Sequence, residues 1–161
     1  MVQLRTRFSA GRLPIKASSE SNNLHRPETV RRAMEPLISI QIQQDRARFC
    51  PGDEIECDYQ IDAIQADEIL AVEASVLWYT EGKGGEDMGV HYFERRVPAE
   101  AQGDLRQWRR FRTKLPNSPL TYEGAIIQVR WCIRVRAIMR QGKQCCFEHP
   151  FRLGHVDSSA T

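Results

Sequence analysis

The amino-acid sequence predicts an all-β fold, namely a two-sheet antiparallel β-sandwich. Three observations lead to this prediction. Apolar and polar side chains alternate along roughly seven or eight segments, turn residues separate the segments, and no convincing helical pattern occurs. Two antiparallel sheets packed face to face bury many one-sided strands in one core.

The longest alternating segment runs from Ala125 to Met139. One of its faces carries Ile127, Val129, Trp131, Ile133 and Val135, and the other carries Gln128, Arg130, Cys132, Arg134 and Arg136. Successive side chains of a strand point to opposite faces, so a period of two held over about ten residues indicates a half-buried strand. A helix would scatter the same residues around its circumference.

The strands before this segment are predicted in chain order. Three isoleucines share one face of Leu37–Gln43, and a connecting segment leads to the Pro-Gly turn in Cys50–Asp53. Apolar and acidic residues alternate in Glu54–Asp62, as in an antiparallel strand with one face in water. A polar connection follows, and then Ile69–Thr80, whose second face is half apolar. We therefore expect Ile69–Thr80 to be central or partly covered.

The next connection, Glu81–Gly89, has four glycines in nine residues and predicts a flexible hairpin. Val90–Val97 is the returning strand, and Leu105–Leu115 follows after a loop. A tight turn at Gln141–Lys143 leads to the last strand, Gln144–Leu153. In the returning strand, one face is expected to hold His91, Phe93 and Arg95.

The loop before the long strand has a composition that constrains its backbone. Pro116 and Pro119 are expected to stop the preceding strand. Gly124 is expected to supply a positive φ before the long strand begins. Tyr122 is expected to pack its ring over the end of the sandwich with its hydroxyl hydrogen-bonded.

A chain of 161 residues suffices for one domain with a real core. Residues 1–36 are predicted to be a basic, disordered tail, residues 37–154 the β-sandwich, and residues 155–161 a polar C-terminal tail. The basic start superficially resembles an organelle transit peptide, but Pro14 would break the necessary helix. No apolar run approaches the roughly 18 to 20 residues that span a bilayer, so no membrane span is expected.

The net charge of +2 conceals a strong segregation along the chain. Residues 37–100 carry five basic and fourteen acidic side chains, whereas residues 101–161 carry eleven basic and four acidic side chains. Such asymmetry can mark an electrostatic surface for a partner. The alternative is that basic and acidic strands lie side by side and pair across the sheet.

The five cysteines favour a reducing compartment. Their number is odd, no C-x-x-C occurs, and the chain shows no secretory apolar segment. We therefore expect a cytoplasmic protein with free thiols. Cys57 and Cys132 lie within strand patterns, where a free cysteine usually serves as a small apolar residue.

Several motifs resemble those of the arrestin-like β-sandwich family. They are the Pro51-Gly52-Asp53 turn, Phe111–Pro116, Ser118–Gly124, and the long strand that follows. The likeness covers residues 37 to 154, which corresponds to a single lobe of this immunoglobulin-like fold and not to the usual tandem pair. It implies a non-enzymatic adaptor or scaffold that binds other proteins, without implying receptor regulation. The Cys…Trp…Cys spacing of a true immunoglobulin domain is absent.

The sequence gives no support for catalysis or for a cofactor. No nucleophile elbow occurs, and His91, His149 and His155, three histidines considered as a spatial cluster, have no signature around them. Cys145-Cys146 lacks ordinary zinc spacing. The acidic side chains of Asp53–Asp58 lie on a strand and lack a calcium loop, and Gly82–Gly85 lacks the phosphate-binding pattern. No metal and no cofactor are therefore predicted.

One group of residues remains as a candidate binding site. Arginine side chains suit carboxylates and phosphates, and they cluster in the second half of the chain. The candidate partner-binding residues are Arg130, Arg134, Arg136, Arg109 and Arg112, with Arg110 and Arg140 nearby in sequence. The alternative is that this stripe faces solvent or pairs with the acidic strand Glu54–Asp58.

Two functions of different classes follow. The first is a protein-binding or scaffold module that uses an exposed strand edge or the arginine face. The second is a nucleic-acid-binding sandwich that uses the basic tail and the arginine stripe, with Trp108 or Tyr122 available to stack on bases. The partner's identity and the oligomeric state are not encoded in any recognisable motif.

Overall fold

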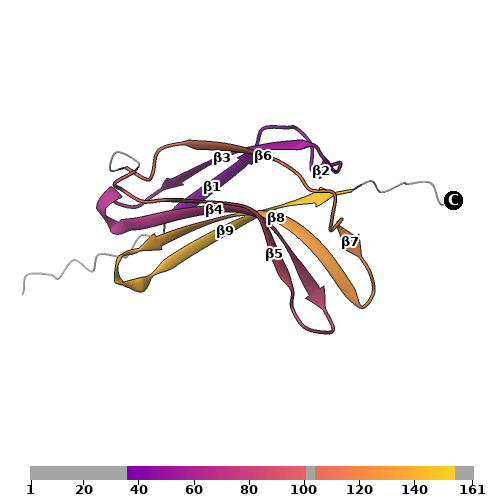
Figure 1. The fold of residues 1–161 in the computed structure, drawn as a ribbon. Helices are drawn as coiled ribbons and strands as arrows, with labels where there is room; N and C mark the ends of the chain where they lie inside the picture. Colours follow the sequence, from indigo (N-terminus) through magenta and orange to yellow (C-terminus); the bar gives the residue numbers. More distant parts are fainter. Residues whose placement is uncertain (1–35, 101–103, 155–161) are drawn as a thin grey trace, which may run out of the picture. The chain divides into compact units, whose positions relative to one another are not determined.

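The protein is described by a computed structural model, in which residues 36–100 and 104–154 are placed (Figure 1). The predicted basic tail, apart from Pro36, and the predicted C-terminal tail lie outside the described residues. The described part is built almost entirely from β-strands that form two sheets, as the alternation predicts. Neither of the short 3₁₀ helices found in these residues is long or apolar enough to cross a membrane.

The smaller sheet contains three antiparallel strands in the order β1-β3-β6. These strands are β1 (Leu37–Ile42), β3 (Glu54–Asp62) and β6 (Arg109–Lys114). The central strand β3 pairs with both neighbours. In its register Ile61 is opposite Ile38 of β1, and Cys57 is opposite Phe111 of β6. This register turns the apolar residues of β3 toward the second sheet.

The larger sheet follows the order β2-β9-β8-β4-β5, with β7 paired to β8. Its strands are β2 (Arg48–Phe49), β4 (Ile69–Gly82), β5 (Met88–Arg96), β7 (Tyr122–Glu123), β8 (Ile127–Met139) and β9 (Gln144–Leu153). The 3₁₀ turns Ala66–Glu68 and Arg140–Gly142 precede β4 and β9. All pairs in this sheet are antiparallel except β2 with β9.

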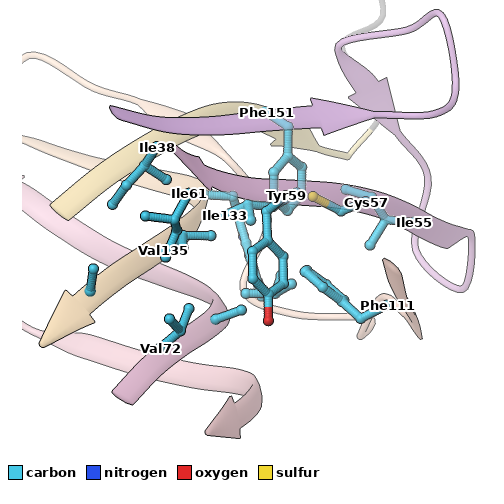
Figure 2. Packing of buried hydrophobic residues seen from close by; sticks show 14 of the residues in the cluster. Ile38, Ile55, Cys57, Tyr59, Ile61, Val72, Phe111, Ile133, Val135 and Phe151 are labelled. Atoms are coloured by element: carbon cyan, nitrogen blue, oxygen red, sulfur yellow. The ribbon is translucent and has the colours of Figure 1, made fainter. Parts of the chain in front are cut away.

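The core lies between the two sheets (Figure 2). The smaller sheet contributes Ile38, Ile55, Cys57, Tyr59, Ile61 and Phe111, and the larger sheet contributes Val72, Val76, Trp131, Ile133, Val135 and Phe151. Trp131, Ile133 and Val135 of the predicted apolar face are buried as expected, whereas Ile127 at its start is 41% exposed. Burial of these aliphatic and aromatic side chains is the main stabilising contribution to a sandwich of this kind.

Most predicted strands agree with the structure, and the differences lie at their ends. Strand β3 spans the predicted residues, whereas β6 begins at Arg109 and leaves Leu105 in a turn that still buries its side chain. The two-residue strands β2 and β7 lie in segments expected to be connections. Neither strand is long enough to show an alternating pattern.

Two local expectations are wrong. A register shift between Val76 and Leu77 gives His91 no partner in β4, so His91 does not share a face with Phe93. Its ring instead lies 6.3 Å from that of Trp131. Gly124 has no positive φ. A Cβ atom there would lie 2.5 Å from Cε1 of Tyr122, so glycine makes room for that ring.

Candidate protein-binding face

The structure brings three of the candidate arginines together on the outer face of the larger sheet. Arg130, Arg134 and Arg136 alternate along β8 with residues that point into the core. The face also carries side chains from β5, β4 and β9, because these strands are hydrogen-bonded in one sheet with β8. The predicted stripe therefore exists as a continuous feature of one strand.

Each arginine of the stripe is paired with a carboxylate. The Nε atom of Arg130 lies 2.5 Å from Glu81 of β4, and the Nε atom of Arg134 lies 2.7 Å from Glu148 of β9. Arg136 binds Glu73 of β4. The stripe thus pairs with glutamates of its own sheet. The alternative expectation, that it pairs with the acidic strand Glu54–Asp58, is wrong for these three arginines.

Glu73 differs from the other two glutamates because it is shared between strands. Its Oε1 atom accepts a hydrogen bond of 2.6 Å from Arg95 of β5, and its Oε2 atom accepts one of 2.9 Å from Nε of Arg136. The Glu73 side chain is only 8% exposed, whereas those of Arg95 and Arg136 are 51% and 44% exposed. Two guanidinium groups therefore share one buried carboxylate, and one positive charge remains on the surface.

Arg134 covers the centre of this face. Its Nε atom binds Glu148 of β9, and its Nη1 atom lies 3.7 Å from the sulfur of Met88 on β5. Strand β4 lies between β8 and β5, so the contact between Arg134 and Met88 spans β4. Leu77 and Cys132 face each other in this region and are buried although they point away from the core.

The other two candidates, Arg109 and Arg112, lie in the smaller sheet. Arg112 points outward on β6 and lies 3.9 Å from Glu54 of β3. Arg109 is two residues from the inward-facing Phe111, and its Nη2 atom lies 3.5 Å from Glu94 of β5. The five candidate arginines therefore do not form one surface.

Strands β3 and β6 neutralise one another, as the alternative explanation of the charge segregation predicts. Arg110 of β6 binds both oxygens of Asp58 on β3 at 2.7 and 2.8 Å and also contacts Glu56 at 2.9 Å. Gln43 donates a further hydrogen bond of 2.7 Å to Asp58. The hydrogen bond from Arg110 lowers the pKa of Asp58, against the opposing effect of burial. This cluster is a structural feature of the smaller sheet.

An exposed apolar row lies next to the arginine stripe, and the alternation pattern does not predict it. Met88, Val90 and Phe93 lie along β5 and are 54%, 52% and 56% exposed. Val90 is opposite Leu77 of β4, and Leu77 is opposite Cys132 of β8. The apolar surface therefore continues from the edge strand across the outer face of the sheet. Met88 falls in the segment expected to be a hairpin loop, so its position just before an alternating segment is the one sequence signal for the row.

Strand β5 is also an edge of its sheet. Among the strands that the structure describes, it pairs only with β4. The bulge at His91 directs that imidazole toward β6, where its Nε2 atom lies 2.8 Å from the main-chain oxygen of Lys114. An unpaired strand edge beside exposed apolar side chains can accept another extended chain.

The cysteines and the described histidines form no comparable site in the part of the chain that the structure describes. All five cysteines are free, and burial raises the pKa of Cys57 and of Cys132 to about 12. Cys145 lies 3.6 Å from the main-chain oxygen of Pro36, and His155 falls outside the described residues. Within residues 36–100 and 104–154, no group of three or more histidine, cysteine or acidic side chains is arranged to hold a metal ion.

Comparison with known proteins supports the fold. No protein-family model and no curated protein sequence match the chain. Among solved structures, the chain is similar to Spo0M, a sporulation control protein from Bacillus subtilis, with a TM-score of 0.53 and 10% sequence identity. The similarity covers 75% of this chain and 50% of that one, so the chain spans about half the length of Spo0M. At this identity the likeness concerns the fold, and it supports an arrestin-like β-sandwich.

Proposed function

We propose that the protein is a non-enzymatic interaction module that binds an extended segment of another protein along β5. The observation that carries this proposal is the coincidence of an unpaired strand edge with the exposed row Met88, Val90 and Phe93. An added strand would gain main-chain hydrogen bonds from the edge, and its alternate side chains would cover the row. The free thiols suit a reducing compartment, so we place this binding in the cytoplasm.

The charged side chains next to Met88, Val90 and Phe93 indicate which charge the partner segment should carry. Arg95 follows Phe93 on the same face of β5. Arg95 and Arg136 both pair with the Glu73 carboxylate, so two positive charges share one negative charge. A bound segment that continues past Phe93 would meet this positive charge. We therefore propose a segment with alternating apolar residues opposite Val90 and Phe93 and an acidic residue opposite Arg95.

The proposal is tested by selecting a phage-displayed library of random peptides of about 12 residues against the full chain. The expected result is enrichment of peptides with alternating apolar residues and an acidic residue near one end. Their binding should be lost in the double variant Val90→Lys, Phe93→Lys. Leu37→Lys is the matched control, because Leu37 is also an exposed apolar residue on an edge strand but belongs to the smaller sheet.

Two results would overturn the proposal. One is failure to enrich any peptide, or enrichment of peptides whose binding is unaffected by the Val90 and Phe93 changes. The other is a concentration-dependent dimer in sedimentation velocity that Val90→Lys abolishes, because β5 would then be an interface between copies of this chain. Amide hydrogen exchange should show protection of β5 by a selected peptide if strand addition occurs.

The nucleic-acid alternative receives less support. Trp108 and Tyr122 are exposed, as stacking requires, but they lie on different segments, before β6 and on β7. The arginines of β8 each bind a carboxylate, which weakens their attraction for phosphates. Retention on heparin that falls steeply with salt would nevertheless favour nucleic acid over a protein partner.

A further inference from the structure

A hollow of about 430 Å³ lies where β5 ends and β6 begins. Side chains that line it include Glu94, Arg96, Glu100, Gln107, Trp108 and Arg109. It includes none of Met88, Val90 and Phe93, but it adjoins the β5 face because Arg95 also lines it. A hollow of this size can hold one or two side chains or a small ligand.

The Glu94 carboxylate lines this hollow and already accepts hydrogen bonds from two tyrosines. Its Oε1 atom accepts a 2.7 Å hydrogen bond from the hydroxyl of Tyr59, and its Oε2 atom accepts a 3.0 Å hydrogen bond from Tyr92. Burial, followed by the interaction with Glu94, raises the pKa of both tyrosines, and that of Tyr92 reaches about 12. Both phenols therefore remain protonated donors near neutral pH, and each occupies one acceptor position on an oxygen of Glu94.

Arg96 and Arg109 are incompletely paired with acceptors among the described residues. Arg109 makes one long contact, at 3.5 Å, to Glu94. The Nη1 atom of Arg96 is the single buried side-chain nitrogen or oxygen without a hydrogen-bond partner in the described part of the chain. Leaving a guanidinium donor buried and unpaired is unfavourable, so such a group usually indicates a missing acceptor.

Trp108 adds an apolar surface to the same hollow. Its side chain is 55% exposed, which is unusual for so large a ring in a small domain. The hollow therefore combines guanidinium donors with one flat aromatic surface. This combination fits a ligand that carries an anion and an apolar group close together.

We propose that this hollow binds a carboxylate group of a peptide, together with the apolar side chain next to it. The planar fork of a guanidinium matches the two oxygens of a carboxylate. Glu94 and Glu100 line the same hollow, so a singly charged carboxylate is favoured over a doubly charged phosphate. The inference does not depend on strand addition at β5.

The test uses nitrogen-15 NMR of the full chain, with the indole N–H of Trp108 and the side-chain N–H signals of Arg96 and Arg109 as reporters. Three peptide probes are titrated: N-acetyl-Gly-Phe with a free carboxylate, the same peptide amidated, and an amidated peptide with an internal glutamate before phenylalanine. Saturable shifts of the three reporters with the free acid and not with its amide are expected. The internal glutamate peptide distinguishes a side-chain source of the carboxylate from a C-terminal one.

Variants make the assignment specific. Arg109→Gln should weaken binding of the free acid about tenfold or more, which corresponds to about 1.4 kcal/mol. Arg112→Gln is the matched control on the same strand, because Arg112 points to the opposite face of the smaller sheet, and it should leave the affinity unchanged. Val90→Lys with Phe93→Lys should also leave it unchanged, so failure here is distinct from failure at β5.

Three results would overturn the inference. They are the absence of any saturable shift, equal shifts with the amidated peptide, and shifts caused by inorganic phosphate in place of the carboxylate probes. Arg109 is half-exposed, and its glutamine variant is therefore expected to fold.

Discussion

The indole N–H of Trp131 donates a 2.9 Å hydrogen bond to the main-chain oxygen of Pro119. Trp131 is 1% exposed at the centre of the longest strand ladder, and the ring of Phe151 lies 5.9 Å away. Pro119 lies in the loop between β6 and β8. One side chain therefore fills the core and also fixes the loop that connects the two sheets.

Replacing Trp131 by phenylalanine should lower the free energy of unfolding by about 1–3 kcal/mol, because the variant leaves the Pro119 oxygen without its donor and leaves space in the core. Urea unfolding followed by circular dichroism measures the change. Trp108→Phe is the control and should change stability by about 0.5 kcal/mol or less, since that ring is more than half exposed. Equal effects of the two variants would contradict this role of Trp131.

Gly89→Ala should destabilise the β4–β5 hairpin. A Cβ atom at this position would lie 2.4 Å from Nε1 of Trp78, so the indole must move. Crowding of this kind costs about 1–3 kcal/mol. Gly85→Ala, in the loop of the same hairpin, is a matched control, because a Cβ atom there meets no atom within 4 Å. Thermal unfolding of both variants should show a lower midpoint for Gly89→Ala only.

Asp58→Asn should make the protein less stable at neutral pH and should flatten its loss of stability in acid. The hydrogen bond from Arg110 lowers the pKa of Asp58 in the folded state. Its contribution is therefore complete above the unfolded pKa of about 3.9 and is lost as the pH falls through the lower folded value. Urea unfolding between about pH 7 and pH 2 measures this. The wild-type and variant curves should converge at low pH, whereas exposed Asp62→Asn should follow the wild type throughout.

Four of the five thiols should react in two classes with a disulfide reagent at mildly alkaline pH. Cys50 and Cys146 are exposed and should react in the folded protein, whereas Cys57 and Cys132 should react only after unfolding. Burial raises the pKa of each of these two to about 12, so almost no thiolate is present. Rapid modification of Cys57 would contradict its position in the core.

The fold was predictable because β3, β4, β8 and β9 are long enough to show their period. Glu54–Asp62 alternates apolar and acidic residues without interruption, and β3 has these bounds. Arg48–Phe49 becomes a strand only because β9 passes beside it, which no local pattern reveals. The extra residue at His91 reverses the alternation of β5 at its midpoint, so its faces could not be assigned from spacing alone.

The candidate site was predictable only in part, because charge pairing depends on which strands are neighbours. Alternation places Arg130, Arg134 and Arg136 on one face of β8, but it cannot show that β4 supplies Glu73 and Glu81 beside them. Arg109 and Arg112 are near these residues in the chain and lie in the other sheet. The unpaired edge of β5 likewise follows from the strand order, which the sequence does not specify.

The ladder between β4 and β8 has a consequence for how the chain folds. It joins residues as distant in the sequence as Ile69 and Met139, and it leaves β4 without this neighbour until β8 has been synthesised. Contacts between distant segments form slowly, because the entropy of closing the intervening loop is lost before the ladder stabilises the chain. The protein should therefore fold slowly for its size, and its nascent chain should need protection from aggregation while β4 waits for its partner.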